Sequence, residues 1–147
     1  MRDIAPEHDA AAGADRRRLH RSAALHGVAV VIFGLMAWRG AGTLGVGAEA
    51  LGVPMLIAGT AGASGALVIV WSVLRHRHRT AHPGPPARTG AQLVARIGMG
   101  LAAVATVAAG VVLAPAGWER EFVISVNTVT GSLLGVFALL AGERRAR

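Results

Sequence analysis

Four long apolar segments, separated by short stretches that hold almost all of the charge, constrain this chain more than any other feature. A membrane-spanning helix needs about 20 predominantly apolar residues. Only 16% of the 147 residues are charged, whereas about a quarter are charged in a typical soluble domain. The sequence therefore predicts an all-α membrane protein with four transmembrane helices, at residues 23–38, 51–74, 97–114 and 122–141.

Helices are expected at these segments because they are continuously apolar and lack the alternation of a membrane β-barrel. The first segment is the shortest, but the flanking Arg21 and Arg39 can extend it by snorkelling. A second interpretation is a cleaved signal peptide, with a basic start, an apolar core and small residues near Ala48. Arg39 in the cleavage region and Trp38, an interfacial residue type, favour a retained span.

The arginines predict the orientation of the four spans. The chain has no lysine, and 13 of its 15 arginines fall in the two tails and the central connection. The other two connections hold only Arg39 and Arg120. Positive charge marks the cytoplasmic side, so both termini are expected in the cytoplasm, with the protein in the cell (inner) membrane. Trp38 and Trp118 then fall at the outer boundary and Trp71 near the inner one, where indole rings prefer to lie.

The spans divide the rest of the chain into tails and linkers. Residues 1–20 are polar and mixed in charge, and they are expected to form a disordered cytoplasmic tail. A transmembrane domain is predicted over 21–142, with a cytoplasmic linker at 75–96 and a second tail at 143–147. Pro54 is expected in the first turn of its span, where a missing N–H does little harm.

Small residues at helical spacing predict close contact between the spans. Lipid gives helices no hydrophobic reason to associate, so close approach of their backbones must supply the packing. Gly59 and Gly62 lie in the second span, and Gly131 and Gly135 form a GxxxG motif in the fourth. These stripes predict a tight bundle, although they would equally serve a homo-oligomer interface.

The two halves of the chain resemble each other, each being a span, a short connection, a second span and an Arg-rich end. The first span reads Gly-x6-Gly from Gly27 to Gly34, and the second repeats this spacing from Gly52 to Gly59. The halves have the same polarity, so they predict two pseudo-repeated helical hairpins of parallel type.

The segments LHGVAVVIFGLMAW and LGVPMLIAGTAGASGAL resemble the hairpin repeat of the HdeD-like membrane proteins, a short-repeat family of unknown function. That family usually has three hairpins, whereas this chain would have two, and Thr128 stands where the first Gly of span four would fall. The resemblance covers residues 23–141. It implies a bacterial, non-enzymatic inner-membrane protein, with acid resistance described for the family's namesake, and it carries no catalytic motif.

Two polar residues lie deep in the spans. His26 is about one turn inside the first span, where it could sense protons or could lie among lipid headgroups. Asn127 is surrounded in the fourth span by hydroxyl residues. It could hydrogen-bond to another helix or line a substrate path with them. The hydroxyl residues are Ser125, Thr128, Thr130 and Ser132.

Glu49 and Glu121 occupy equivalent places at the outer ends of the second and fourth spans. Paired carboxylates can perform acid–base chemistry or hold a cation. The simpler interpretation is that each complements the dipole of the helix that it begins.

Other classes of chemistry are not expected. Without cysteine or lysine the chain can form neither a thiolate site nor a Schiff base. No nucleotide-binding or hydrolase motif is present, so no cofactor or metal site is predicted. The alternating Arg and His of residues 75–79 indicate a patch for anionic headgroups, because arginines repel a metal cation. The arginines that give the chain its net charge of +7 flank the spans, so no nucleic-acid partner is expected.

These observations predict a non-enzymatic membrane protein with a structural, assembly or stress-related role. Its expected partners are the anionic headgroups of the bilayer, further copies of itself, or another membrane protein. One alternative is a small transporter or channel component with Asn127 on the path. Another is an enzyme that acts on a lipid-soluble substrate through Glu49 or Glu121.

Overall fold

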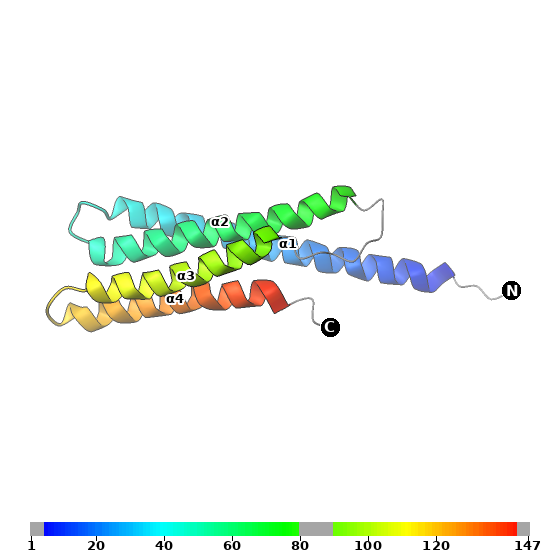
Figure 1. Cartoon of the computed structure of the whole chain (residues 1–147). Helices are drawn as coiled ribbons and strands as arrows, with labels where there is room; N and C mark the ends of the chain where they lie inside the picture. Colours follow the sequence, from blue (N-terminus) through cyan, green and yellow to red (C-terminus); the bar gives the residue numbers. More distant parts are fainter. Residues whose placement is uncertain (1–4, 80–89, 144–147) are drawn as a thin grey trace.

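The computed structural model describes residues 5–79 and 90–143, with side chains for 24–72, 74–75 and 90–141. Over these ranges every secondary-structure element is a helix: α1 (Ala5–Gly42), α2 (Glu49–Arg79), α3 (Gly90–Val112) and α4 (Glu119–Glu143). The helices lie side by side with alternating direction (Figure 1). By length and composition each can cross a membrane, which makes the chain a multi-pass membrane protein. The candidate spans are Ala24–Gly42, Glu49–Ser72, Gly90–Val112 and Glu119–Ala141.

Two short turns join α1 to α2 and α3 to α4 at the same end of the bundle (Figure 1). Gly45 and Gly47 of the first turn have φ of 81°, and Gly117 of the second has φ of 126°. Only glycine adopts these values without strain, so these residues allow the chain to reverse within a few positions. The predicted pair of hairpins, α1–α2 and α3–α4, is therefore present.

All four helices are longer than the predicted spans, and α1 and α3 begin well before them. α1 includes residues 5–20, which were expected to be disordered. Alanines are frequent there, Pro6 falls in the first turn, and Glu7 lies close behind it, all of which favour the start of a helix. α3 begins at Gly90, seven residues before the predicted span, because the polar Gln92 and Arg96 interrupt the apolar run without breaking the helix.

The predicted linker at 75–96 is therefore shorter, since α2 continues to Arg79 and α3 already begins at Gly90. Its Pro-rich run lies outside the described residues. Of the predicted tail at 143–147, only the last residue of α4 is described.

α2 is the central helix of the bundle and α1 is the peripheral one. In an 18-residue apolar stretch of each span, 39% of the residues are buried in α2 and only 6% in α1. The core consists of small and medium side chains from α2, α3 and α4, namely Ala58, Ile69, Met99, Ala103, Leu134 and Ala138. α1 packs mainly on α2, and the choice between a retained span and a signal peptide stays a prediction.

Glycines bring neighbouring helices into close contact. A Cβ atom at Gly59 would lie 2.7 Å from the Cα atom of Ala37 in α1, and one at Gly62 would overlap the ring of Phe33. A Cβ at Gly131 would lie 2.8 Å from a backbone oxygen of α3, whereas one at Gly135 would make only an ordinary contact of 3.8 Å. Gly59, Gly62 and Gly131 are therefore packing residues, as predicted, and Gly135 tolerates a larger side chain.

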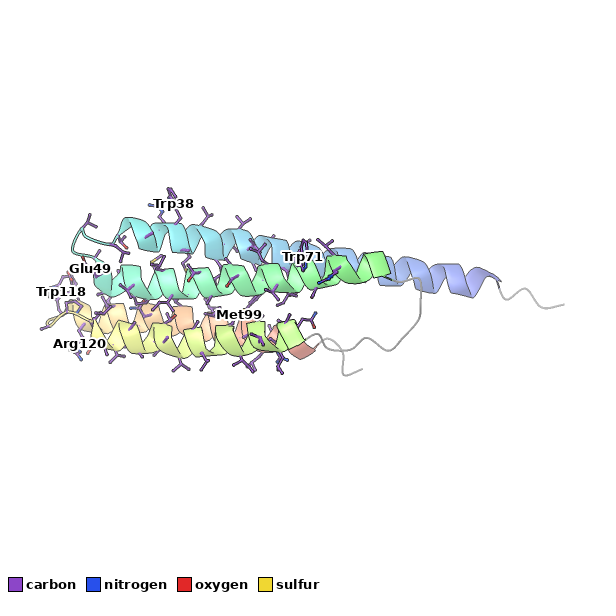
Figure 2. All side chains as sticks on the ribbon, turned by 45° about the horizontal axis from the view of Figure 1, so that its top comes forward. Trp38, Glu49, Trp71, Met99, Trp118 and Arg120 are labelled. Carbon is purple, nitrogen blue, oxygen red and sulfur yellow. The ribbon has the colours of Figure 1, made fainter. Side chains whose placement is uncertain are left out.

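The three tryptophans occupy the two ends of the bundle (Figure 2). Trp38 and Trp118 lie in the half that holds the two turns, and Trp71 lies in the other half. All three side chains are exposed. This distribution matches the interfacial positions that the sequence predicted for them.

Candidate functional site

Asn127 of α4 lies fully buried where α4 meets α2 and α3. Its Nδ2 atom donates a hydrogen bond of 3.0 Å to the backbone carbonyl oxygen of Ala50, near the start of α2. The two residues are 77 positions apart. The hydrogen bond between helices that the sequence analysis considered is thus present, and it joins the second hairpin to the first.

The carbonyl of Ala50 requires a donor from outside its helix because of Pro54. In an α-helix each carbonyl accepts the N–H four residues later, and α2 begins this pattern with Gly52 donating to Ala48 at 2.9 Å. Pro54 is the sixth residue of α2 and has no N–H to donate to Ala50. Asn127 takes the place of that donor. The expectation that Pro54 lies harmlessly in the first turn is therefore wrong, since it lies in the second.

α3 completes the surroundings of Asn127. A Cβ atom at Gly110 would lie 2.6 Å from Asn127 Nδ2, so only glycine leaves room there for the carboxamide. One turn away, the fully buried Thr106 donates its hydroxyl hydrogen to the Ala102 carbonyl at 2.7 Å. Asn127 Oδ1 has no hydrogen-bond partner among the described residues. A carboxamide is neither an acid nor a base near neutral pH, so the arrangement can hold helices together but cannot exchange protons.

The hydroxyl residues of α4 do not share the position of Asn127. Ser125, Thr128 and Ser132 are exposed, and Thr130 is half-buried. At 3.6 residues per turn, Ser125 and Ser132 fall on the side of α4 opposite Asn127, and Thr128 lies about 100° from it. The structure therefore does not bring Asn127 and these hydroxyls together on one substrate path.

His26 of α1 is buried beside Phe137 of α4. The centre of its imidazole lies 5.8 Å from that of the Phe137 ring, tilted by 58°. Phe33, two turns along α1, packs on the same Phe137 at 5.6 Å. The structure thus packs His26 against a ring of α4, and the choice between proton sensing and a position among lipid headgroups stays a prediction.

Glu49 and Glu121 lie exposed in the first turns of α2 and α4. The Oε1 atom of Glu49 accepts the backbone N–H of Gly45 at 3.1 Å and so closes the turn before α2. Glu121 makes neither a hydrogen bond nor an ion pair with a described residue. Each carboxylate lies at a helix N-terminus, where negative charge is favourable. His26 is roughly 24 Å from this end along α1, so the three groups do not converge.

Three residues join helices at the other end of the bundle, and sequence reasoning missed their role. Gln92 Nε2 donates to Ser72 Oγ at 2.6 Å, and this hydroxyl in turn donates to the Ile69 carbonyl at 2.7 Å. Arg96 Nε donates to the Ala138 carbonyl in α4 at 3.0 Å. Gln92 and Arg96 were assigned to the linker, although their four-residue spacing is typical of one helix face.

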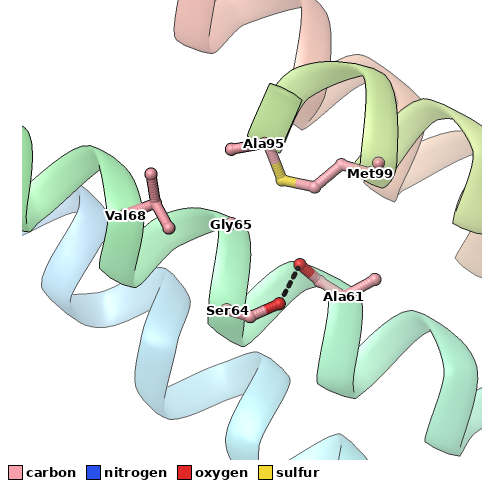
Figure 3. Close-up of a pocket in the computed structure, with 7 residues that line it drawn as sticks. Ala61, Ser64, Gly65, Val68, Ala95 and Met99 are labelled. Atoms are coloured by element: carbon pink, nitrogen blue, oxygen red, sulfur yellow. Dashed lines mark hydrogen bonds between the residues drawn. The ribbon is translucent and has the colours of Figure 1, made fainter. Parts of the chain in front are cut away.

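A small open groove of about 220 Å³ lies between α2 and α3 (Figure 3). Two stretches line it, Ala61–Val68 of α2 and Ala95–Met99 of α3. The Ser64 hydroxyl at its edge already donates to the carbonyls of Thr60 and Ala61. The groove therefore presents an apolar surface without a titratable group.

Among the described residues, the structure does not bring several reactive side chains together at one place. No three His, Cys, Asp or Glu residues of those described come close enough to hold a metal ion. The histidines of the 75–79 run lie outside the described side chains. Comparisons with protein-family models, with curated proteins and with solved structures found no match.

Proposed function

We propose that this chain is a non-enzymatic, four-span protein of the cell (inner) membrane that functions by assembly. It forms a packed helical bundle that associates with copies of itself or with another membrane protein. One observation carries the proposal: the polar side chains inside the bundle hydrogen-bond from one helix to another. Asn127 bonds to Ala50, Gln92 to Ser72, and Arg96 to Ala138. In transporters and pumps such groups mark the path of the substrate instead.

The proposed orientation in the membrane and the proposed lipid contacts follow from the charge distribution. The 13 arginines of one side would face the cytoplasm and attract anionic headgroups. The resemblance to the HdeD-like proteins agrees with a bacterial inner-membrane protein and would add a stress-related role. In support, Gly52 and Gly59 of its spacing pattern are buried against α1.

The proposal is tested by counting chains and measuring flux with the full-length protein. Single-molecule photobleaching in native membrane vesicles should find several copies per complex, or one copy bound at fixed ratio to another membrane protein. Liposomes that hold the purified chain should show no saturable solute flux.

Two results would contradict assembly as the function. Saturable flux through a single copy that Asn127→Ala abolishes would establish transport instead. Turnover of a lipid-soluble substrate that is lost in Glu49→Gln or Glu121→Gln would establish an enzyme.

A further inference from the structure

The groove between α2 and α3 has a closed floor and an open side (Figure 3). Met99 of α3 closes the floor, since its side chain is 1% exposed and a Cβ atom at Gly65 of α2 would overlap its sulfur atom. Ser64 of α2 and Gly98 of α3 also line the groove, and both are exposed. In a membrane the groove therefore opens towards lipid chains, which fill it or leave its lining without contacts.

Arg75 lies in line with this groove, towards the end of the bundle away from the turns. Ala61 and Val68 line the groove, and Arg75 follows Val68 at the same seven-residue spacing. Seven residues are nearly two helical turns, so each step departs from a straight line by only about 20°. Trp71 comes one turn before Arg75, about 40° from it round the helix, and is 68% exposed. This side of α2 therefore presents apolar groove, indole ring and guanidinium group in succession.

The α2–α3 pair supplies no anion for Arg75. The side chain of Arg75 is exposed and makes neither an ion pair nor a hydrogen bond with any described residue. Between Glu49 and Glu119 the sequence contains five arginines and no acidic residue. A guanidinium group can bind a phosphate through two parallel hydrogen bonds, and arginines near a membrane attract anionic lipids. The charge beyond the groove is therefore complementary to the phosphate of a lipid.

The separation of Arg75 and Ala61 along α2 matches the length of one lipid. The two residues are 14 positions apart, which is about 21 Å at 1.5 Å per residue. A bilayer with its headgroups is about 40–45 Å thick, so one leaflet is about 20–22 Å. A lipid whose phosphate lies at Arg75 can therefore extend one acyl chain along the groove as far as Ala61.

We propose that this side of the bundle binds one anionic phospholipid, with its phosphate at Arg75 and one acyl chain in the groove between α2 and α3. The inference rests on the proposed function, and it names the lipid partner and the place where that lipid binds. The groove supplies apolar contacts along the chain, and Arg75 selects the headgroup by its charge.

The same features argue against a second copy of the chain as the occupant. Two copies related by a two-fold axis along the membrane normal bring identical residues together at the same depth. Paired through this side of α2, they would place Arg75 beside its own copy, and like charges repel. A helix with its side chains is also about 10–12 Å in diameter, which is too wide to enter a groove of about 220 Å³.

Trp71 is a natural probe of the site, because brominated acyl chains quench the fluorescence of a tryptophan that they contact. In the full-length chain, Trp38→Phe and Trp118→Phe leave Trp71 as the only tryptophan of the three. In phosphatidylcholine vesicles, a small fraction of brominated phosphatidylglycerol should quench Trp71 more strongly than the same fraction of brominated phosphatidylcholine. Equal quenching by the two lipids would overturn the proposal.

Two arginine variants test the headgroup contact. Arg75→Gln should lower the affinity for brominated phosphatidylglycerol, relative to phosphatidylcholine, by about five-fold, which is the effect of one arginine near anionic headgroups. Arg39→Gln is the matched control, since Arg39 is exposed at the other end of the bundle, and it should leave the quenching of Trp71 unchanged. An equal loss in both variants would overturn the role of Arg75.

Two glycine variants test the groove without changing any charge. A Cβ atom at Gly98 or at Gly100 would meet no atom within 4 Å, so both positions of α3 accept a side chain. Gly98 lines the groove and Gly100 does not. Gly98→Leu should therefore fill the groove and abolish the preference for phosphatidylglycerol, whereas Gly100→Leu should retain it. A preference that persists in Gly98→Leu would overturn the groove as the place of the acyl chain.

The outcomes separate this inference from the proposed function. Equal quenching by the two lipids, in a chain that still forms complexes of several copies, would overturn the lipid site and leave assembly intact. Saturable flux through a single copy would overturn assembly, whereas a lipid preference that Gly98→Leu abolishes would still support the site. Fewer copies per complex in Gly98→Leu, with the quenching unchanged, would make the groove an interface between copies and overturn the lipid site.

Discussion

At the scale of single residues, the bundle combines two groups that are each unfavourable alone in a membrane helix. Pro54 leaves the Ala50 carbonyl without its helical donor, and Asn127 places a carboxamide at a fully buried position. Their hydrogen bond of 3.0 Å gives the Ala50 carbonyl a donor and the buried Nδ2 atom of Asn127 an acceptor. Because Ala50 and Asn127 lie on different hairpins, this bond also sets the register of the two hairpins.

We expect the effects of Asn127 and Pro54 to be coupled. Asn127→Ala should lower the free energy of unfolding by about 1–2 kcal/mol, the range of a hydrogen bond between membrane helices. In a Pro54→Ala background the loss should be smaller, because the restored N–H at position 54 can bond to Ala50 within the helix. A double-mutant cycle from unfolding in mixed micelles measures the coupling. Equal losses in both backgrounds would contradict the role given to Pro54.

At the scale of helices, the two Gly-x6-Gly pairs have different environments. In α2, Gly52 and Gly59 are buried against α1, where an added Cβ atom would overlap the neighbouring helix. In α1, Gly27 and Gly34 have no atom within 4 Å of the place where a Cβ would lie. The same spacing therefore marks a contact surface in one helix and an open surface in the other.

This difference gives a matched pair of substitutions. Gly59→Ala should lower the free energy of unfolding by about 1–3 kcal/mol, the usual cost of overpacking a close contact. Gly34→Ala should leave it unchanged or raise it slightly, since alanine favours a helix more than glycine does. Unfolding in detergent followed by circular dichroism compares the two variants. Equal destabilisation would mean that α1 does not pack on α2 through the surface described.

At the scale of the whole molecule, charge and packing determine different properties. Both hairpin turns lie at one end of the bundle, and the arginine clusters of α1 and α2 lie toward the other. The contacts between helices would be the same if the bundle were inverted in the membrane. The orientation therefore depends on the arginines alone, through their preference for the cytoplasmic side.

Reporter fusions test that orientation. Fusions at positions 45 and 118, in the two turns, should report the outer side of the membrane, and a fusion at 85 should report the cytoplasm. A matched chain with the arginines of 75–79 replaced by glutamine should show a weaker preference, because the bias between the two sides is smaller. An outer location for position 85 in the unaltered chain would refute the proposed topology.

The sequence alone was sufficient for the number of spans, their approximate positions and the hairpin arrangement. These depend on hydrophobicity and on turn residues, which act within each segment and need no knowledge of its neighbours. The residues at which α1 and α3 begin were harder to predict from the sequence. Helical residues such as Gln92 and Arg96 are too polar to extend an apolar run.

Only the tertiary structure decided which side of each helix is buried. It placed Asn127 inside and Ser125, Thr128 and Ser132 outside, although all four lie within eight residues. It likewise separated Gly59 from Gly34, and it revealed the bond from Arg96 to α4. The physical reason is that the lipid-facing and the packed sides of a membrane helix are both apolar. The sequence therefore carries no amphipathic pattern to tell them apart, and the buried side is decided by the neighbouring helices.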